Sequence, residues 1–299
     1  MRIVVLGSAA GGGHPQWNCH TPASLRAWDQ QTGASRRTQA SIAVSADGER
    51  WLLVNASPDF RQQILATPAL WPQRDLRHSP IEAVLLTSGE IDHIAGLLSM
   101  RESQRFDLYA SARVLEVLSQ NPVFDALNPD YVTRRPLTLE QPLEVVGLRV
   151  TPFGVPGKVP LFMEGRSAGN FAGSAEETLG LIIEHAGHRC HFIPGCAAMT
   201  DALRERLRDS ELVFFDGTLW HDDEMVAAGI SRKTGHRMGH MSIDDSDGSM
   251  AAFDDLDVAR KIFIHINTTN PVLNDHSPER AAATARGWEV SHDGMEISL

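Results

Sequence analysis

The chain has 299 residues, enough for one large α/β domain or two small ones, and its apolar (42%) and charged (22%) fractions are ordinary for a globular protein. Its net charge of −11 argues against nucleic acid as a partner, because a phosphate backbone requires clustered Lys and Arg. Three cysteines do not favour a disulfide framework, and no apolar run reaches the roughly 18–20 residues of a membrane span. The apolar run at the N-terminus is too short for a signal sequence, so we expect a cytoplasmic protein without membrane insertion.

Short apolar stretches bounded by turn-forming residues predict strands along the whole chain. Ile81–Leu86 is a largely apolar run, the pattern of a strand that is buried on both faces. The predicted strands are Met1–Leu6, Gln39–Ser45, Trp51–Asn55, Ile81–Leu86, Phe106–Tyr109, Leu143–Phe153 (one strand, or two with a break at Gly147), Thr178–Glu184, Arg189–Ile193, Leu212–Phe215, Lys261–Ile266, Trp288–Val290 and Met295–Leu299.

Helices are predicted between these strands. They are Pro58–Leu65, Ile94–Arg101, Ala112–Leu118, Asp201–Arg208 and Ser277–Arg286. Residues 154–176 form a long segment rich in Gly, Pro and Ser, and a loop of that length is often functional. Because strands and helices alternate without a low-complexity linker, we expect one α/β domain over residues 1–299, with two sheets packed face to face and helices outside.

Asp92 and His93 follow the strand predicted at Ile81–Leu86 and stand at the start of a helix. This position is the rim of a sheet, where α/β proteins commonly bind ligands. The alternative interpretation is structural, with Asp92 as a helix N-cap and His93 hydrogen-bonded beside it.

His265 lies inside the predicted strand Lys261–Ile266, where its two ring nitrogens need partners in apolar surroundings. It could be a core histidine bonded to a backbone carbonyl. However, the strand leads into the polar segment Asn267–Pro271, which indicates the rim of an active site. Together, Asp92, His93 and His265 supply the two histidines and one carboxylate of the facial ligand set associated with non-haem Fe(II).

Asp216 directly follows the predicted strand Leu212–Phe215 and is a candidate for the same rim. The acidic run Asp222–Glu224 that follows is more simply explained as a solvated loop. His240 could face the substrate, support a ligand or be merely exposed.

Three other patterns do not support a site. The glycines of residues 7–13 are spaced Gly-x-x-x-Gly-Gly-Gly, and no helix is predicted after them, which argues against a nucleotide cofactor. Cys190 and His191 would point to opposite faces of one strand, which argues against a shared zinc site. The Gly-x-Ser-x-Gly nucleophile elbow is absent.

Several blocks along the chain resemble, in order, the protein B family of pyrroloquinoline quinone (PQQ) synthesis, a divergent branch of the metallo-β-lactamase superfamily. These blocks are Val5–Gly13 with Pro15–Cys19, Asn55–Asp59, Ile91–His93 with Gly96–Leu98, Asp216–Trp220 with Asp222–Met225, His265–Asn267 with Thr269–Pro271, and Ser277–Arg280. The resemblance covers essentially the whole chain. It implies a four-layer αβ/βα sandwich of two packed mixed sheets with outer helices, and a metal site at one edge between the sheets.

The resemblance also implies a ligand set. The superfamily motif His-x-His-x-Asp-His corresponds to residues 88–93, so Ser88 and Glu90 stand where histidines usually bind a first metal. Gly195 stands where an aspartate usually bridges two metals. The implied ligands of the surviving second site are Asp92, His93 and His265, with Glu90 as a further oxygen ligand.

Relatives typically carry a Cys-x-Cys-x-x-Cys zinc site near the N-terminus. Here Cys19 remains, but Thr21 and Ser24 replace the other two cysteines. Because a zinc site needs several such ligands, we do not expect this structural zinc, although His14 or His20 could substitute for a lost thiolate.

The family implies a role in making PQQ from a Glu-Tyr unit derived from a peptide. Because one metal held by Asp, His and His leaves open positions for O2 and a phenol, we favour an Fe(II) oxygenase that hydroxylates the tyrosine ring; the same ligands also suit Zn(II) and Mn(II). The loop at residues 154–176 is expected to cover the substrate. The residues expected to contact the substrate or support the ligands are Ser88, Arg37, Asp59, Asp216, Thr218, His240 and Asn267.

Two alternative functions remain open. The protein could be a non-enzymatic carrier that takes part in transport or export of PQQ or its precursor, or it could be a hydrolase that uses a single metal. The expected partner is a small-molecule or dipeptide-like precursor of PQQ, with other proteins of the PQQ pathway as further candidates.

Overall fold

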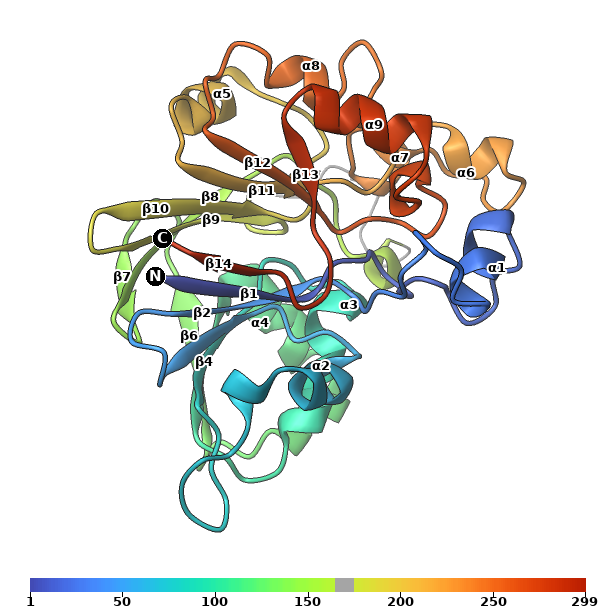
Figure 1. Ribbon diagram of the computed structural model, residues 1–299. Coiled ribbons are helices and arrows are strands. Elements are labelled where there is room, and N and C mark those ends of the chain that lie inside the picture. The colour runs from blue at the N-terminus through green and yellow to red at the C-terminus, as the bar shows by residue number, and fades with distance from the viewer. Residues whose placement is uncertain (165–174) are drawn as a thin grey trace.

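Two seven-stranded sheets pack face to face in the computed structural model, which describes residues 1–164 and 175–299 (Figure 1). The first sheet contains, in spatial order, β14 (Glu296–Ser298), β1 (Arg2–Gly7), β2 (Ser41–Ser45), β3 (Trp51–Val54), β4 (Ile81–Leu85), β5 (Phe106–Ser111) and β6 (Val132–Leu137). The second contains β13 (Trp288–Val290), β12 (Arg260–Ile264), β11 (Leu212–Asp216), β10 (His188–Ile193), β9 (Leu179–His185), β8 (Leu148–Gly154) and β7 (Leu143–Val145).

Helices form the two outer layers (Figure 1). Beyond the first sheet lie α2 (Phe60–Ala66), α3 (Ile91–Ile94) and α4 (Ala112–Ser119), with the 3-10 helices η1 (Pro68–Leu70), η2 (Ala95–Met100) and η3 (Pro122–Ala126). On the side of the second sheet lie α5 (Asp201–Leu207), α6 (Glu224–Ala227), α7 (Gly235–Met238), α8 (Ser249–Ala252), η5 (Pro271–Leu273) and α9 (Pro278–Ala285). This arrangement confirms the predicted four-layer sandwich. No helix in the described part of the chain is both long and apolar enough to cross a membrane.

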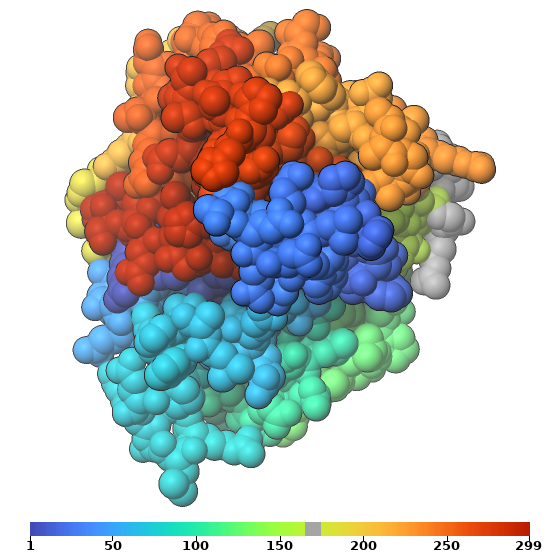
Figure 2. All heavy atoms as spheres, turned by 45° about the vertical axis from the view of Figure 1, so that its right-hand side comes forward, coloured from blue at the N-terminus to red at the C-terminus, as the bar shows by residue number. Residues whose placement is uncertain are grey.

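One edge of the sandwich carries the loops that matter for function. There α1 (Pro22–Trp28) and η4 (Leu161–Met163) lie beside the junction of the two sheets. Figure 2, which is turned toward this edge, shows the blue N-terminal segment between the two halves of the molecule. The edge therefore combines loops from the beginning, middle and end of the chain.

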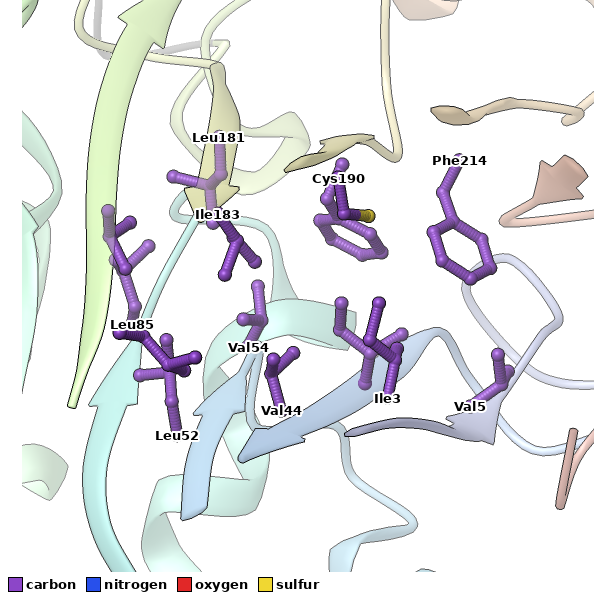
Figure 3. Close-up of a cluster of buried hydrophobic side chains, with 14 of the residues drawn as sticks. Ile3, Val5, Val44, Leu52, Val54, Leu85, Leu181, Ile183, Cys190 and Phe214 are labelled. Atoms are coloured by element: carbon purple, nitrogen blue, oxygen red, sulfur yellow. The ribbon is translucent and has the colours of Figure 1, made fainter. Parts of the chain in front are cut away.

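Three clusters of buried apolar side chains hold the layers together. Side chains alternate along a strand, so Ile3 and Val5 of β1 face the second sheet, whereas Val4 and Leu6 pack beneath the helices of the first. Figure 3 shows the inner faces of the two sheets meeting, with Phe214 of β11 on the opposite side from β1. Because both faces of these central strands are buried, their sequences are almost continuously apolar.

The segment from Ile94 to Arg101, which the pattern predicts as one helix, begins with the last residue of α3 and continues as the 3-10 helix η2. Gly96 lies at this change and packs directly on the preceding loop. A Cβ atom at Gly96 would lie only 2.1 Å from the carbonyl oxygen of Ser57. Close backbone packing, rather than an apolar stripe, therefore governs the segment.

Helix α9 begins at a serine cap whose removal gives a first test of the fold. The hydroxyl of Ser277 accepts a 3.0 Å hydrogen bond from the backbone N–H of Arg280, one of the N–H groups that a helix start leaves unpaired. We expect Ser277→Ala to lower the free energy of unfolding by about 1 kcal/mol in urea titrations. Ser277→Asp keeps a hydrogen-bond acceptor and should retain most of the free energy of unfolding that the cap contributes. Ser35→Ala, at an exposed site outside any helix or strand, should not change the free energy of unfolding. Equal stability of the Ser277→Ala variant and the unaltered chain would contradict the capping role.

Candidate metal centre

The candidate ligands meet where strands of both sheets end. β11 and β12 are parallel neighbours, so Asp216 and His265 emerge at the same edge of the second sheet. In the first sheet, β4 leads at this edge to Asp92 and His93 at the start of α3. An isolated bridge joins the segment after β4 to the segment before β9. Residues far apart in sequence are thereby brought into one site.

Asp92, His93 and His265 offer ligand atoms that all lie within 4.8 Å of one another. Nε2 of His265 lies 2.9 Å from Oδ2 of Asp92, and Nε2 of His93 lies 3.8 Å from the same oxygen. His93 is buried, and its Nε2 has no hydrogen-bond partner among the described residues, a costly state for a buried polar atom. A divalent cation among the three side chains would satisfy this nitrogen, so the residues fit a metal with imidazole and carboxylate ligands.

The charges within this group favour a bound cation. Burial lowers the pKa of His93 to about 4, with the Asp92 carboxylate opposing the shift, so this imidazole is neutral at pH 7, as a metal ligand must be. Burial alone would raise the pKa of Asp92, but His93 and His265 outweigh it and hold that pKa well below its usual value. Burial would lower the pKa of His265, but the Asp92 carboxylate outweighs burial and raises it. The pair formed by Asp92 and His265 therefore attracts one positive charge, either a proton or a metal ion.

A second group formed by Asp216, His240 and His265 adjoins the first. Nδ1 of His240 donates to Oδ2 of Asp216 at 2.7 Å, and the His240 ring stacks on His265 with the ring centroids 5.2 Å apart. Asp216 is completely buried, and the backbone N–H of Cys196 also donates to it at 2.8 Å. Burial would raise the pKa of Asp216, but His240 outweighs it and lowers that pKa, so the carboxylate is ionised. This ionised carboxylate fixes the ring that packs on His265.

A pocket of about 280 Å³ opens onto the three candidate ligands of the first group. Its wall combines apolar, cationic and polar side chains from both sheets and from the N-terminal loop. Among the lining residues are Gly11, Lys158, Leu161, Lys233, His240 and Asn267. A small polar molecule could therefore reach the ligands from solvent.

Comparison with known proteins identifies the family of this chain. The model of the beta-lactamase superfamily domain matches residues 50–266. Coenzyme PQQ synthesis protein B of Xanthomonas oryzae pv. oryzae (strain MAFF 311018) is 77% identical over 299 residues and is covered completely, as is this chain. The protein of the same name from Methylobacterium nodulans is 53% identical over 300 residues, again with complete coverage of both. The chain belongs to the coenzyme PQQ synthesis protein B family.

Solved structures agree with this assignment. The crystal structure of Zn(2+)-bound PqqB from Methylobacterium extorquens, refined at 1.98 Å, is 51% identical, has a TM-score of 0.97 and covers all of both chains. A diphosphatase of the PhnP family is only 22% identical, with a TM-score of 0.69 over 100% of this chain and 97% of the other, and it shows the shared fold alone. Family and fold are therefore those that the sequence blocks predict.

In this family member, five of the seven residues expected to support the ligands or contact the substrate lie at the site. Oγ of Ser88 is 2.7 Å from Nδ1 of His93, and Oγ1 of Thr218 is 2.9 Å from Nδ1 of His265. Asn267 lines the pocket and donates from Nδ2 to the Thr269 hydroxyl at 2.6 Å. With Asp216 and His240, these residues surround the ligands.

Glu90, expected as a further oxygen ligand, belongs to neither ligand group among the described residues. Its carboxylate accepts a 3.0 Å hydrogen bond from the ammonium group of Lys158 and a 3.1 Å hydrogen bond from the backbone N–H of Leu161. These donors already compensate its charge. The structure therefore assigns Glu90 to an ion pair in the pocket wall and not to the ligand set.

Arg37 and Asp59, expected near the substrate, do not line the pocket. The buried guanidinium of Arg37 donates to the carbonyl oxygen of Ser291, and burial lowers its pKa to about 10. Asp59 accepts 2.9 Å hydrogen bonds from both the backbone and side-chain amides of Gln39. Because Gln39 in turn accepts from the backbone N–H of Gly12 at 2.9 Å, Asp59 supports the glycine-rich loop. Both residues have structural roles behind the site.

The N-terminal polar residues form hydrogen bonds with one another. Sγ of Cys19 lies 3.4 Å from the hydroxyl of Thr21, which also accepts from the backbone N–H of Ser24. Nδ1 of the buried His14 lies 2.9 Å from the hydroxyl of Thr268. Thr21 thus serves as the N-cap of α1.

Lys158, Lys233 and Leu161 line the pocket but were not among the predicted site residues. Nothing in a loop rich in Gly and Pro marks a lysine as functional, and its position becomes clear only from the fold. Of the segment 154–176 that was expected to cover the substrate, residues 165–174 lie outside the described residues, whereas the part before them supplies Lys158 and Leu161.

Proposed function

We propose that this chain acts in PQQ biosynthesis as a mononuclear, metal-dependent oxygenase that hydroxylates the tyrosine ring of a Glu-Tyr-derived precursor. Membership of the protein B family supports the pathway, and the Zn(2+)-bound relative supports a divalent metal. The observation that carries the proposal is the unpartnered Nε2 of His93, which lies beside Asp92 and His265. A structural role alone would not require this nitrogen to be left bare.

Asp92, His93 and His265 would hold the metal, for which we favour Fe(II). With positions left open by only three protein ligands, Fe(II) would supply the activation of O2 that hydroxylation of a phenol requires. Asp216 holds the proton of His240 on Nδ1, so Nε2 is the nitrogen left to accept the phenol proton. His240 would thus act as the general base that activates the ring.

Lys158 and Lys233 would hold a carboxylate of the precursor. Both line the pocket and are ion-paired within it: Lys158 lies 3.0 Å from Glu90 and 3.5 Å from Glu164, and Lys233 lies 3.2 Å from Glu164. A carboxylate of the precursor would therefore join this ion-pair network or displace one of its members. The exposed side chain of Leu161, which lines the same pocket, offers an apolar surface for the ring. A dipeptide-like molecule with charged ends and one aromatic ring is the substrate that such a wall suits.

Oxygen uptake by the protein tests this proposal. The metal-free protein is loaded anaerobically with Fe(II) and mixed with a Glu-Tyr dipeptide and ascorbate, which supplies the two electrons that reduce the second oxygen atom to water. We expect oxygen consumption and a product that gains one oxygen atom at each step. Protein loaded with Zn(II) is the matched control and should consume none, because Zn(II) has no redox chemistry.

Two other outcomes would replace the oxygenase. Binding of PQQ without any consumption of oxygen or dipeptide would identify a carrier for transport or export. Release of a cleaved product without oxygen would identify a single-metal hydrolase. Either result would contradict the oxygenase while leaving the ligand group itself to be tested separately.

A further inference from the structure

The hydroxyl of Thr218 faces Nδ1 of His265, the ring nitrogen that points away from Asp92, and donates its own proton to another acceptor. Oγ1 of Thr218 lies 2.6 Å from Oδ1 of the ionised Asp216 and 3.0 Å from the carbonyl oxygen of His265, and both are acceptors. The single hydroxyl proton therefore points to one of these oxygens. A lone pair then faces Nδ1 of His265 at 2.9 Å, so Nδ1 must carry a hydrogen. Nε2, which lies 2.9 Å from Oδ2 of Asp92, is thereby left as the position for the metal ion or, without a metal, for a proton shared with that carboxylate.

Nδ1 of His93 faces two hydroxyls, and the surroundings of its Nε2 favour the same state. Oγ of Ser88 lies 2.7 Å from Nδ1 of His93, and Oγ1 of Thr87 lies 3.4 Å from it. Thr87 donates its proton to Oδ1 of Asn55 at 3.1 Å, so it too faces the ring with a lone pair. If Nδ1 were bare and Nε2 carried the hydrogen, that buried N–H would have no acceptor within hydrogen-bond distance, since Oδ2 of Asp92 is 3.8 Å away.

We propose that Ser88 and Thr218, here called the hydroxyl pair, are positioning residues that keep the proton of both ligand histidines on Nδ1 and so direct both Nε2 atoms to the metal. The inference rests on the metal centre of the proposed function but not on its oxidation chemistry. A hydrogen-bond partner of the ring nitrogen that does not bind the metal fixes both the tautomer and the ring orientation of a ligand histidine.

The two members of the hydroxyl pair come from different sheets. Ser88 follows β4 in the first sheet, and Thr218 follows β11 in the second. Both hydroxyl-bearing residues are nearly fully buried, at 4% exposure each, so water does not compete for the ring nitrogens. Each sheet therefore supplies one ligand histidine together with the hydroxyl that contacts its Nδ1.

Zinc affinity and the histidine tautomers together test the inference. We expect Ser88→Ala and Thr218→Val each to weaken Zn(II) binding by about 10- to 100-fold, measured by competition with a chromophoric chelator. Thr218→Ser retains the hydroxyl and should restore most of the affinity. In Zn(II)-loaded protein labelled with 15N at histidine, the Nδ1–H signals of His93 and His265 should be protected from water exchange, and each alanine or valine variant should lose the protection of one of them.

Ser45→Ala is the matched control. Ser45 is also a buried serine of the first sheet, but it lies at the far end of β2 and donates to the carbonyl oxygen of Arg50. Its replacement should change neither zinc affinity nor the two signals. Unchanged affinity in the Ser88→Ala and Thr218→Val variants would overturn the inference, as would lower affinity with both Nδ1–H signals intact. Absence of zinc binding by the unaltered chain would instead overturn the metal centre, and the inference with it.

Discussion

Replacing His265 by alanine is expected to weaken metal binding by more than about 1,000-fold, beyond the 10- to 100-fold cost of losing a supporting partner. His265 is shared by both groups of candidate ligands, and its Nε2 lies 2.9 Å from Asp92. Without this ring, only one imidazole and one carboxylate remain in the first group. Zn(II) affinity from chelator competition gives the measurement, and oxygen uptake with Fe(II) should disappear in parallel.

The backbone conformation of His265 means that a second substitution is needed to separate loss of the ring from backbone strain. His265 has a φ of 60°, in the left-handed region, which alanine adopts at some cost but asparagine tolerates well. Loss of metal in both His265→Ala and His265→Asn would therefore identify the imidazole, and not backbone strain, as the cause. His185→Ala on β9 removes a histidine whose Nδ1 donates to the carbonyl oxygen of Gly147, and it should bind metal normally. Normal affinity in a folded His265→Asn variant would contradict the assigned metal centre.

The fold was predictable where composition reflects burial. β4 and β11 lie inside their sheets, and both appear in the sequence as apolar runs. β6 is not predicted because Arg134 and Arg135 interrupt its apolar pattern and because Pro136 argues against a central strand. The structure places β6 at the edge of its sheet, where a proline is tolerated. The helices α6, α7 and α8 have four residues each, too few to show a helical period.

The site was predictable as a set of residues but not as a set of roles. Asp92, His93 and His265 stand in motifs and at strand ends, so their meeting follows from the fold class that the sequence indicates. The contact of Glu90 with Lys158 joins residues 68 positions apart in sequence and depends on the path of an irregular loop. No local pattern records that path, so the sequence indicates Glu90 as a further oxygen ligand, whereas its carboxylate accepts a hydrogen bond from the ammonium group of Lys158.

His191 lies on β10 with Cys190 and Phe192 on either side, and these two neighbours face the core between the sheets. The alternation of the strand turns His191 to the opposite face, where it is 1% exposed and neither ring nitrogen has a hydrogen-bond partner among the described residues. Burial, with smaller contributions from the positive charges of Arg189 and Arg206, lowers the pKa of His191 to about 4. The folded protein thus keeps this ring neutral at a pH where the unfolded chain takes up a proton.

The stability that depends on this neutral ring is present above pH 6.5, the ordinary pKa of histidine in the unfolded chain, and is lost as the pH falls toward 4. His191→Leu removes both the buried unpaired nitrogens and the titration. We expect the variant to be more stable than the unaltered chain by about 1–3 kcal/mol at pH 7.5. We expect this difference to grow by about 2.5 kcal/mol at pH 4.5, because only the unaltered chain then favours the protonated, unfolded state.

Urea titrations of metal-free protein at the two pH values give the free energies of unfolding. Using metal-free protein removes competition between protons and metal at the ligand histidines, and any titration of those residues cancels because both chains share it. His20→Leu replaces an exposed histidine and should show no growth of the difference between pH 7.5 and pH 4.5. If the difference for His191→Leu were the same at both pH values, His191 would have to take up its proton equally in the folded and unfolded chains, and its burial without partners would carry no pH-dependent cost.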